Sequence, residues 1–309
     1  MVLMNSNIVV CAYHNVGYRC MQELLGQGAQ IALVFTHEDS PTEEIWFRSV
    51  RDLAKQHAIP CLTTDINLPE NVERVRAIAP AFIFSFYYRN MITAEILGIP
   101  RLGALNLHGS YLPRYRGRVP VNWAVINGET ETGATLHYMV EKPDAGDIVD
   151  QERVGIAFSD TARDVFGKVT DAAVTVIARA WPLLRDGRAA RIPMNLAEGN
   201  YCGGRKPADG RIDWTKSAVQ VYNLIRGVTH PYPGAFTWLG GKRVTIWDAR
   251  PVEGNGPPGQ ILSQSPLLAA AGQGALEIRT LQLEGGQECS AAEFVMQHAI
   301  PITSFQENP

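Results

Sequence analysis

Short apolar runs alternate with amphipathic segments through the first hundred residues, and this alternation constrains the fold more than any other feature of the sequence. Apolar runs at 8–10, 31–35 and 61–62 are predicted strands, and segments of helical periodicity follow at 18–25, 43–56 and 69–77. The apolar run at 82–86 suits a buried central strand. Strands that alternate with helices predict an α/β domain, in which a parallel sheet carries helices on both faces.

Parallel sheets of this kind bind ligands at the carboxyl ends of their strands, so a nucleotide-binding motif would be expected in the loop after the first strand. The segment that follows the first strand, AYHNVGYRCM, holds only Gly17 where a dinucleotide fingerprint needs several glycines. No GxxxxGK[ST] pattern occurs either. NAD, FAD and P-loop sites are therefore excluded, and His14, within the turn predicted at 13–17, is interpreted as a surface or turn histidine.

The stretch 103–120, GALNLHGSYLPRYRGRVP, carries the most chemistry in the chain. An extended approach places Asn106 and His108 on the same side of a segment where a strand ends. Glycines and a proline then force a loop that holds Arg114, Arg116 and Arg118. A histidine beside a carboxamide, followed by a cationic loop, suits a catalytic centre for an anionic substrate. A strand that ends in a polar turn has the same pattern.

A tight acidic loop, EKPDAGD, lies between predicted strands at 132–140 and 148–156. Asp144 lies in a Pro-x-x-Gly turn of this loop, and beside a histidine it would favour the charged imidazole and fix its tautomer. Asp147 is a rival for the same role. A turn aspartate that makes only a local hydrogen bond also fits the spacing.

The second half of the chain changes character after residue 185. Before it, a short helix is predicted at 121–126, and Ser159 and Asp160 are predicted to cap a long helix that reaches 184, with an apolar stripe typical of a core. Glycine, proline and charged residues at 186–210 mark a boundary between domains 1–200 and 201–309. A helix at 217–225 and strand-like runs at 235–239, 243–247, 260–262 and 275–283 predict a small β-barrel or sandwich.

The composition limits the class of protein. At 309 residues the chain exceeds what one core usually supports, and its 46% hydrophobic and 19% charged residues are typical of a globular protein. A net charge of −3 argues against a protein that binds a polyanion through overall charge. Five scattered cysteines without a CxxC pair predict thiols, with no disulfide framework and no zinc site. Because no basic leader and no 18-residue apolar run occur, we expect a cytoplasmic protein that is not bound to a membrane.

Two motifs together resemble those of the folate-dependent formyltransferase family. The first is Asn106-Leu107-His108-Gly109-Ser110 with the loop that continues LPRYRG, and the second is Asp144-Ala145-Gly146-Asp147-Ile148. Their order and separation are specific to that family, and the resemblance covers nearly the whole chain. It implies a Rossmann-like, parallel-sheet catalytic domain followed by a smaller OB-fold-like barrel, which agrees with both halves of the pattern above.

The resemblance also implies a site and a cosubstrate, 10-formyltetrahydrofolate. Asn106 would donate a hydrogen bond to the oxyanion of the transition state, His108 would move the proton, and Asp144 would hold and tune His108. No metal is implied. The residues implied to contact the folate are Asn90, Met91, Ile92, Arg118, Val140, Glu141, Lys142, Pro143 and Asp144.

Within the family, five segments resemble the formyltransferase half of the bifunctional polymyxin-resistance enzymes, which formylate UDP-4-amino-4-deoxy-L-arabinose for lipid A modification. These segments are VCAYH (10–14), VFTH (34–37), FSFYYR (84–89), NGETET (127–132) and PGAF (233–236). The match departs from that branch at Tyr111, where leucine is usual, and in the lack of a decarboxylase domain. The second departure implies a stand-alone protein or an expressed fragment.

Four functions stay open at this point. A nucleotide-linked amino-sugar formyltransferase would act on small molecules, with the arginines of the loop as phosphate-binding candidates. Methionyl-tRNA formyltransferase is the alternative. From residue 201 onward, however, the chain has nine Lys and Arg and nine Asp and Glu, and this equal number disfavours binding to a nucleic acid. A hydrolase that releases formate and a non-catalytic folate-binding protein complete the set. The sequence does not predict the oligomeric state.

Overall fold

The computed structural model describes residues 7–41, 44–297 and 303–306. Internal contacts divide these residues into two compact units. The first unit takes its residues from segments 1–120, 131–155 and 166–203, and the second from segments 121–130, 156–165 and 204–309. The two consecutive domains, 1–200 and 201–309, stay a prediction, because a division by contacts does not define what folds independently.

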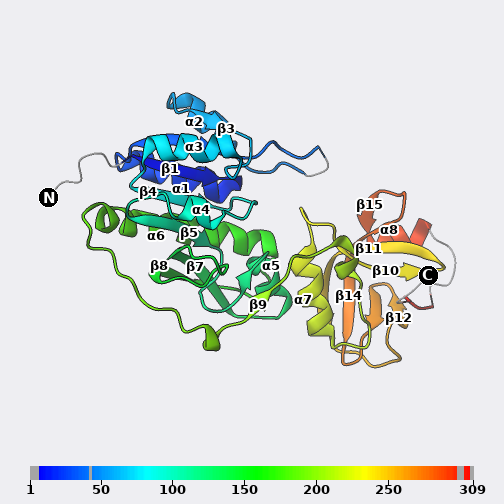
Figure 1. The fold of residues 1–309 in the computed structure, drawn as a ribbon. Helices are drawn as coiled ribbons and strands as arrows, with labels where there is room; N and C mark the ends of the chain where they lie inside the picture. The colour runs from blue at the N-terminus through cyan, green and yellow to red at the C-terminus, as the bar shows by residue number, and fades with distance from the viewer. Residues whose placement is uncertain (1–6, 42–43, 298–302, 307–309) are drawn as a thin grey trace. The chain divides into compact units, whose positions relative to one another are not determined.

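A seven-stranded sheet forms the centre of the first unit, in the order β3-β2-β1-β4-β5-β7-β8 (Figure 1). Its strands are β1 (Ile8–Ala12), β2 (Ile31–Phe35), β3 (Cys61–Leu62), β4 (Phe82–Phe86), β5 (Gly103–His108), β7 (Glu131–Tyr138) and β8 (Ile148–Gly155). The first five strands are parallel, which confirms the predicted parallel sheet, whereas β7 and β8 are antiparallel to their neighbours. The loop 139–147 between β7 and β8 is too short for the crossover that a parallel pair needs.

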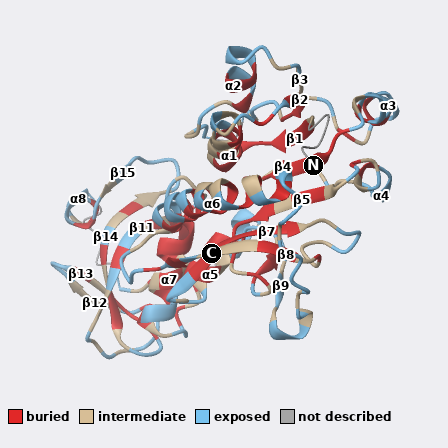
Figure 2. Ribbon diagram, turned by 90° about the vertical axis from the view of Figure 1, so that its left-hand side faces the viewer, coloured by how far each residue is buried: buried red, intermediate tan, exposed pale blue. Residues whose placement is uncertain are grey.

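Helices cover the central strands on both faces. Every residue of β1 and β4 is buried, which the red strands in Figure 2 show, and this is the pattern of strands enclosed between two helical layers. The helices of this part of the chain are α1 (His14–Gly26), α2 (Val50–Gln56), α3 (Pro69–Ile78), α4 (Ala94–Leu97), α5 (Pro120–Ile126) and α6 (Ala162–Arg185).

The turn predicted at 13–17 is wrong, because α1 already begins at His14. The Gly17 N–H donates to the Tyr13 carbonyl at 3.1 Å, so these residues form the first turn of the helix. The ring of His14 packs against Phe47 at a centroid distance of 4.0 Å and against Phe166 at 4.7 Å. His14 is therefore part of an aromatic cluster and not the surface histidine that the sequence predicted.

Two further helices begin later than predicted. Helix α2 begins at Val50, because Ser49 caps it by accepting a 3.1 Å hydrogen bond from an N–H of its first turn. The expected start at Glu43 lies outside the described residues. Helix α6 is capped by Thr161, whose hydroxyl accepts from the Asp164 N–H at 3.2 Å, and not by Ser159 and Asp160. The predicted core stripe of α6 is confirmed, since its members are all buried: Val165, Val169, Ala172, Val176 and Ala180.

The second unit contains an antiparallel sheet in the order β10-β11-β14-β13-β12, with β15 beside β14. Its strands are β10 (Ala235–Leu239), β11 (Lys242–Val252), β12 (Ile261–Gln264), β13 (Leu267–Ala270), β14 (Ala275–Leu283) and β15 (Glu288–Ser290), with helices α7 (Ala218–Val228) and α8 (Ala291–Gln297). Segment 303–306 exchanges backbone hydrogen bonds with Trp238 of β10 and with Gly259 and Ile261 at β12. Because it pairs with both edge strands, it closes the sheet into the predicted barrel.

The described residues contain no membrane-spanning helix, no candidate metal cluster and no disulfide. None of their helices has the length and apolar composition needed to cross a bilayer. Their His, Cys, Asp and Glu side chains form no group of three or more that could hold a metal ion. All five cysteines are free thiols, as predicted: Cys11, Cys20, Cys61, Cys202 and Cys289.

Candidate active site

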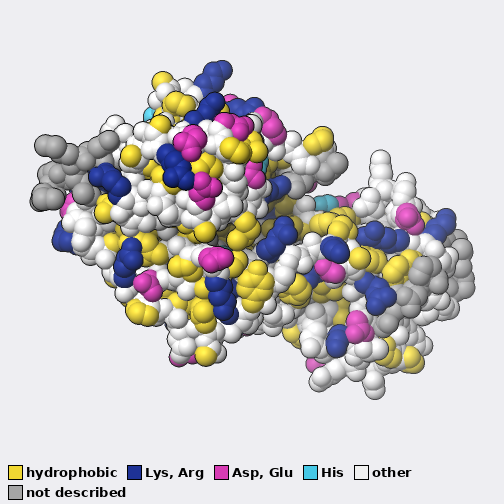
Figure 3. Space-filling view, viewed as in Figure 1, with side chains coloured by type: hydrophobic (Ala, Val, Ile, Leu, Met, Phe, Trp, Pro, Cys, Tyr) yellow, Lys and Arg dark blue, Asp and Glu magenta, His cyan; other side chains and the backbone are white. Residues whose placement is uncertain are grey.

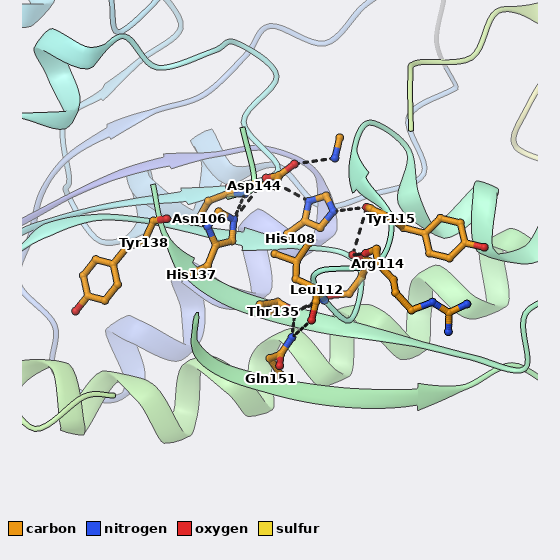
Figure 4. Close-up of polar contacts among 12 residues, drawn as sticks. Asn106, His108, Leu112, Arg114, Tyr115, Thr135, His137, Tyr138, Asp144 and Gln151 are labelled. Atoms are coloured by element: carbon orange, nitrogen blue, oxygen red, sulfur yellow. Dashed lines mark hydrogen bonds and ion pairs between the residues drawn. The ribbon is translucent and has the colours of Figure 1, made fainter. Parts of the chain in front are cut away.

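Asn106 and His108 lie on one face of β5 at its carboxyl end, as predicted (Figure 4). Strand β5 pairs with β7, and in that register Asn106 lies directly opposite His137. Directly opposed residues of neighbouring strands project their side chains to the same face of the sheet. The sheet therefore adds a second histidine to the predicted pair.

The carboxylate of Asp144 lies against all three of these side chains. Its Oδ1 is 3.3 Å from Asn106 Nδ2, 3.4 Å from His137 Nε2 and 3.6 Å from His108 Nδ1. Its Oδ2 accepts a hydrogen bond of 2.8 Å from the Gly117 N–H. Asp144 has a left-handed backbone, with φ of 49°, a conformation that aspartate tolerates better than most residues. This turn brings the loop after β7 back to β5.

The environment of Asp144 favours its charged form. Burial alone would raise the pKa of this carboxyl, whose side chain is 12% exposed. The charge of His108, the hydrogen bond and charge of His137, and the Gly117 N–H all act in the opposite direction and outweigh burial. The pKa of Asp144 therefore lies well below its usual range, and a negative charge is held within the sheet at neutral pH.

His108 is buried, and its two ring nitrogens face different partners. Nε2 lies 2.8 Å from the carbonyl oxygen of Tyr115. Because a carbonyl oxygen only accepts, Nε2 carries the hydrogen, and Nδ1 is the nitrogen that gains and loses a proton. Nδ1 faces Asp144 at 3.6 Å, a distance suited to an ion pair but too long for a hydrogen bond. A backbone carbonyl thus sets the tautomer, a role that the sequence analysis gave to Asp144.

The loop that follows β5, residues 109–117, is called the His108 loop below, and polar side chains of β7 and β8 hold it. Thr135 Oγ1 accepts from the Leu112 N–H at 3.1 Å and donates to the Ser110 carbonyl at 2.7 Å. Gln151 Nε2 donates to the Leu112 carbonyl at 2.8 Å and to Thr135 Oγ1 at 2.9 Å. Within the loop, Ser110 Oγ donates to the Arg114 carbonyl at 2.7 Å. These bonds position the Tyr115 carbonyl that holds His108.

Gly117, whose N–H contacts Asp144, lies where a side chain does not fit. Its φ is 100°, in the region that favours glycine, and it pairs with Cys202 in the short sheet of β6 (Arg116–Gly117) and β9 (Tyr201–Cys202). A Cβ at this position would collide with the Cys202 carbonyl oxygen. Glycine therefore allows the N–H to reach the carboxylate.

The residues predicted to contact folate lie on three segments. Residues 90–92 follow β4, where Asn67 Nδ2 donates to the Met91 carbonyl at 2.8 Å. Arg118 is exposed, and its N–H donates to the Cys202 carbonyl at 3.0 Å. Residues 140–143 lead from β7 to Asp144. Among the described residues, Asp144 is the member of this set that contacts His108.

The contacts of Asp147 and the exposure of the loop arginines agree only in part with what the sequence predicts. The carbonyl of Asp147 accepts from the Tyr138 N–H at 2.8 Å, and no contact joins its side chain to His108 within the described part of the chain. Arg114 and Arg118 are exposed, but Arg116 is buried. The loop is therefore only partly the solvated cationic surface that its sequence suggests.

Sequence reasoning missed His137, Thr135 and Gln151. Residues 135 and 137 are two apart in a predicted strand, so alternation alone places both side chains on one face. That the face is the one occupied by Asn106 depends on the register of β5 with β7, which no local pattern records. The Tyr115 carbonyl and the Gly117 N–H are backbone groups, so the identity of the side chains does not predict their contacts.

The chain matches two family models. The model for formyl transferase covers residues 11–181, and the model for the formyl transferase C-terminal domain covers residues 205–299. The first of these two models therefore covers more than half of the chain.

Solved structures of similar fold include several formyltransferases. An N-formyltransferase from Helicobacter canadensis, in complex with folinic acid and dTDP-3-aminofucose, superimposes with a TM-score of 0.69 at 16% identity over 93% of this chain and 100% of its own. WlaRD, a sugar 3N-formyl transferase in the presence of dTDP and 5-N-formyl-THF, gives 0.68 at 18% identity over 92% and 98%.

HypX from Aquifex aeolicus, in complex with tetrahydrofolic acid, gives a TM-score of 0.65 at 19% identity over 97% of this chain and 49% of its own. The chain thus spans about half the length of HypX. At these identities the structures establish a shared fold. Taken with the two family matches, which follow one another along the sequence, they show that this chain belongs to the formyl transferase family.

Proposed function

We propose that the protein transfers the formyl group of 10-formyltetrahydrofolate to the amine of a nucleotide-linked amino sugar, and that this sugar is UDP-4-amino-4-deoxy-L-arabinose. The observation that carries the proposal is the cluster of Asn106, His108 and Asp144 at the carboxyl end of β5. Such a cluster provides a hydrogen-bond donor, a proton carrier and a fixed negative charge, which are the three elements that acyl transfer to an amine needs.

His108 carries the proton in this mechanism. The amine attacks the formyl carbon, a carbon–nitrogen bond forms, and the ammonium proton passes to Nδ1 of His108. The imidazolium then returns a proton to the folate nitrogen as its bond to carbon breaks, which leaves tetrahydrofolate and the N-formyl sugar. Asp144 stabilises the imidazolium, because its Oδ1 faces Nδ1 at 3.6 Å. General acid–base catalysis of this kind contributes about 10²- to 10⁴-fold to the rate.

Asn106 stabilises the negative oxygen that develops on the formyl carbon. Its Nδ2 lies within 3.3 Å of both Asp144 Oδ1 and His137 Nε2. His137 Nδ1 lies 2.9 Å from the Tyr138 carbonyl and so carries a hydrogen. When Nε2 is protonated as well, it donates to Asp144, and one N–H of Asn106 is released for the oxyanion. One such donor is worth about 3 kcal/mol of transition-state stabilisation.

The residues around the cluster fit a folate. Met91 is 64% exposed and Val140 is 47% exposed, so each offers an uncovered apolar side chain to a ring. Arg118 is exposed and cationic, which suits the carboxylates of the glutamate tail. Asn90, Ile92 and residues 141–143 complete the proposed folate contacts, in part through backbone groups.

A small nucleotide sugar is favoured over tRNA as the acceptor. Basic and acidic residues are equal in number from residue 201 onward, and on the face shown in Figure 3 the two signs are interspersed. Binding to tRNA depends on many phosphate contacts and so favours a surface with excess positive charge. The two sugar formyltransferases of similar fold support the same class of acceptor. Lipid A modification is the proposed context because of the five segments named above.

The test is a formyl-transfer assay with 10-formyltetrahydrofolate and a panel of acceptors. The panel holds UDP-4-amino-4-deoxy-L-arabinose, other UDP- and dTDP-linked amino sugars, and methionyl initiator tRNA. Turnover of the UDP-arabinose sugar supports the proposal, and turnover of another sugar alone keeps the mechanism but changes the acceptor. Formylation of tRNA alone, or release of formate without an acceptor, contradicts it. The variant His108→Ala should lose about 10²- to 10⁴-fold in kcat, whereas the exposed His57→Ala should retain it.

A further inference from the structure

Arg116 lies between the two backbone groups that hold the site. The residue before it, Tyr115, presents its carbonyl to His108, and the residue after it, Gly117, presents its N–H to Asp144. The Arg116 N–H donates to the Asn200 carbonyl at 3.1 Å, within the pairing of β6 with β9. The backbone of Arg116 is therefore held on both sides, directly between the peptide groups that contact His108 and Asp144.

The side chain of Arg116 is largely buried, and its Nε lacks a hydrogen-bond partner. The residue is 8% exposed, and its Nε is enclosed with no hydrogen-bond acceptor. Within residues 7–41, 44–297 and 303–306, no carboxylate forms an ion pair with it and no side-chain hydrogen bond involves it. Arg226 provides the contrast, since it is 4% exposed but donates from Nε to Asn223 Oδ1 at 2.9 Å and from Nη1 to the Asp160 carbonyl at 2.7 Å.

A buried charge that lacks an opposite charge destabilises a folded protein, so proteins rarely retain one without a ligand or a function that requires it. We infer that Arg116 binds an oxyanion of a substrate, which provides the negative charge that the protein lacks at this position. This inference rests on the proposed function, because that function supplies two such groups. One is the diphosphate of the sugar nucleotide, and the other is the glutamate carboxylate of the folate.

The diphosphate is the favoured source. In a UDP-linked 4-amino sugar the phosphate is attached to C1, across one pyranose ring from the amine. An amine beside His108 therefore places that phosphate one ring away, within the range of a side chain that starts between Tyr115 and Gly117. The planar guanidinium matches a phosphate with two parallel hydrogen bonds, and the largely buried side chain of Arg116 makes stronger bonds than the exposed Arg114 and Arg118 can make in water.

The experiment compares Arg116→Met and Arg116→Lys with wild type and with Arg74→Met, an exposed arginine on α3. Calorimetry measures the Kd of UDP and of 5-formyltetrahydrofolate, and differential scanning measures the Tm of the ligand-free proteins. We expect Arg116→Met to weaken UDP binding by about 10- to 150-fold, the loss expected for hydrogen bonds to a charged group. Its ligand-free Tm should not fall and should rise by about 2 to 4 °C, because an unpaired buried charge is removed.

The possible outcomes distinguish which ligand Arg116 binds, whether Arg116 binds an oxyanion at all, and whether the proposed formyl transfer occurs. A loss of affinity for the folate alone would identify its carboxylate as the oxyanion. A destabilised Arg116→Met, together with an Arg116→Lys that binds both ligands as wild type does, would show a structural role and overturn the inference. If wild type formylates the sugar while both variants keep the two affinities, the inference fails and the function stands. If UDP binding depends on Arg116 but no formyl transfer occurs, the function fails and the inference stands.

Discussion

Replacement of Asp144 by asparagine tests the electrostatics of the site, because it removes the charge and keeps the shape of the side chain. The carboxylate accepts from Gly117 at 2.8 Å and from Asn106 at 3.3 Å. Hydrogen bonds to a charged group contribute about 1.5–3 kcal/mol, whereas neutral ones contribute about 0.5–1.5 kcal/mol. Loss of the charge should weaken each bond by about 1 kcal/mol, so Asp144→Asn should lower the free energy of unfolding by about 2 kcal/mol at pH 7.

The difference between wild type and Asp144→Asn should depend on pH in one direction. The pKa of Asp144 is lower in the folded protein than in the unfolded chain, so the carboxylate stabilises the fold above the unfolded pKa of about 4. As the pH falls below about 4, the unfolded chain takes up a proton on Asp144 that the folded protein does not. Wild type should then lose about 1.4 kcal/mol per pH unit relative to the variant.

Urea denaturation of both proteins at pH 7, 5, 4 and 3 measures this difference. We expect a gap of about 2 kcal/mol at pH 5 and a gap below 1 kcal/mol at pH 3. A gap that stays constant from pH 5 to pH 3 would refute the assignment of a lowered pKa to Asp144. The control for activity is Asp147→Asn in the same loop, whose kcat should match that of wild type.

Three further substitutions test the groups around Asp144. Asn106→Ala should lower kcat by about 10²-fold through a lost oxyanion donor, and a double-mutant cycle with Asp144→Asn should show strong non-additivity in kcat, which independent effects would not give. Gly117→Ala should lower both Tm and kcat, since its Cβ collides with the Cys202 carbonyl oxygen; a thermal scan with unchanged Tm would contradict this. Thr135→Val should cost about 1–3 kcal/mol of stability and reduce kcat, while Thr135→Ser should restore both, because the hydroxyl makes two hydrogen bonds with the His108 loop and one with Gln151.

Local sequence patterns predicted the central strands of the first unit well, because these strands are buried and therefore apolar. Strands β1, β2 and β4 are short apolar runs enclosed on both faces, so composition alone identifies them. Strands β13 and β15 of the second unit were not predicted. The first, LLAA, is a run of four residues that fits a helix equally well, and the second, ECS, has no apolar alternation.

The candidate site was predictable as far as it consists of side chains on a single strand. Asn106 and His108 are two residues apart on β5, so the sequence places them on one face. His137 is brought to them by strand pairing across 31 residues of sequence, and Gln151 by a further pairing of β7 with β8. Register between distant strands depends on the packing of the whole sheet, and no local pattern determines it.

In the proposed mechanism, proton transfer and substrate binding depend on different groups of one short segment. The Tyr115 carbonyl and the Gly117 N–H orient His108 and Asp144, and because they are peptide groups, a change of the side chain at 116 leaves them in place. The side chain between them can therefore vary with the substrate while the geometry of proton transfer is kept. A substitution at Arg116 should accordingly change the KM of a substrate that carries an oxyanion and leave the pH dependence of kcat unaltered, since no proton that moves in the reaction belongs to the guanidinium.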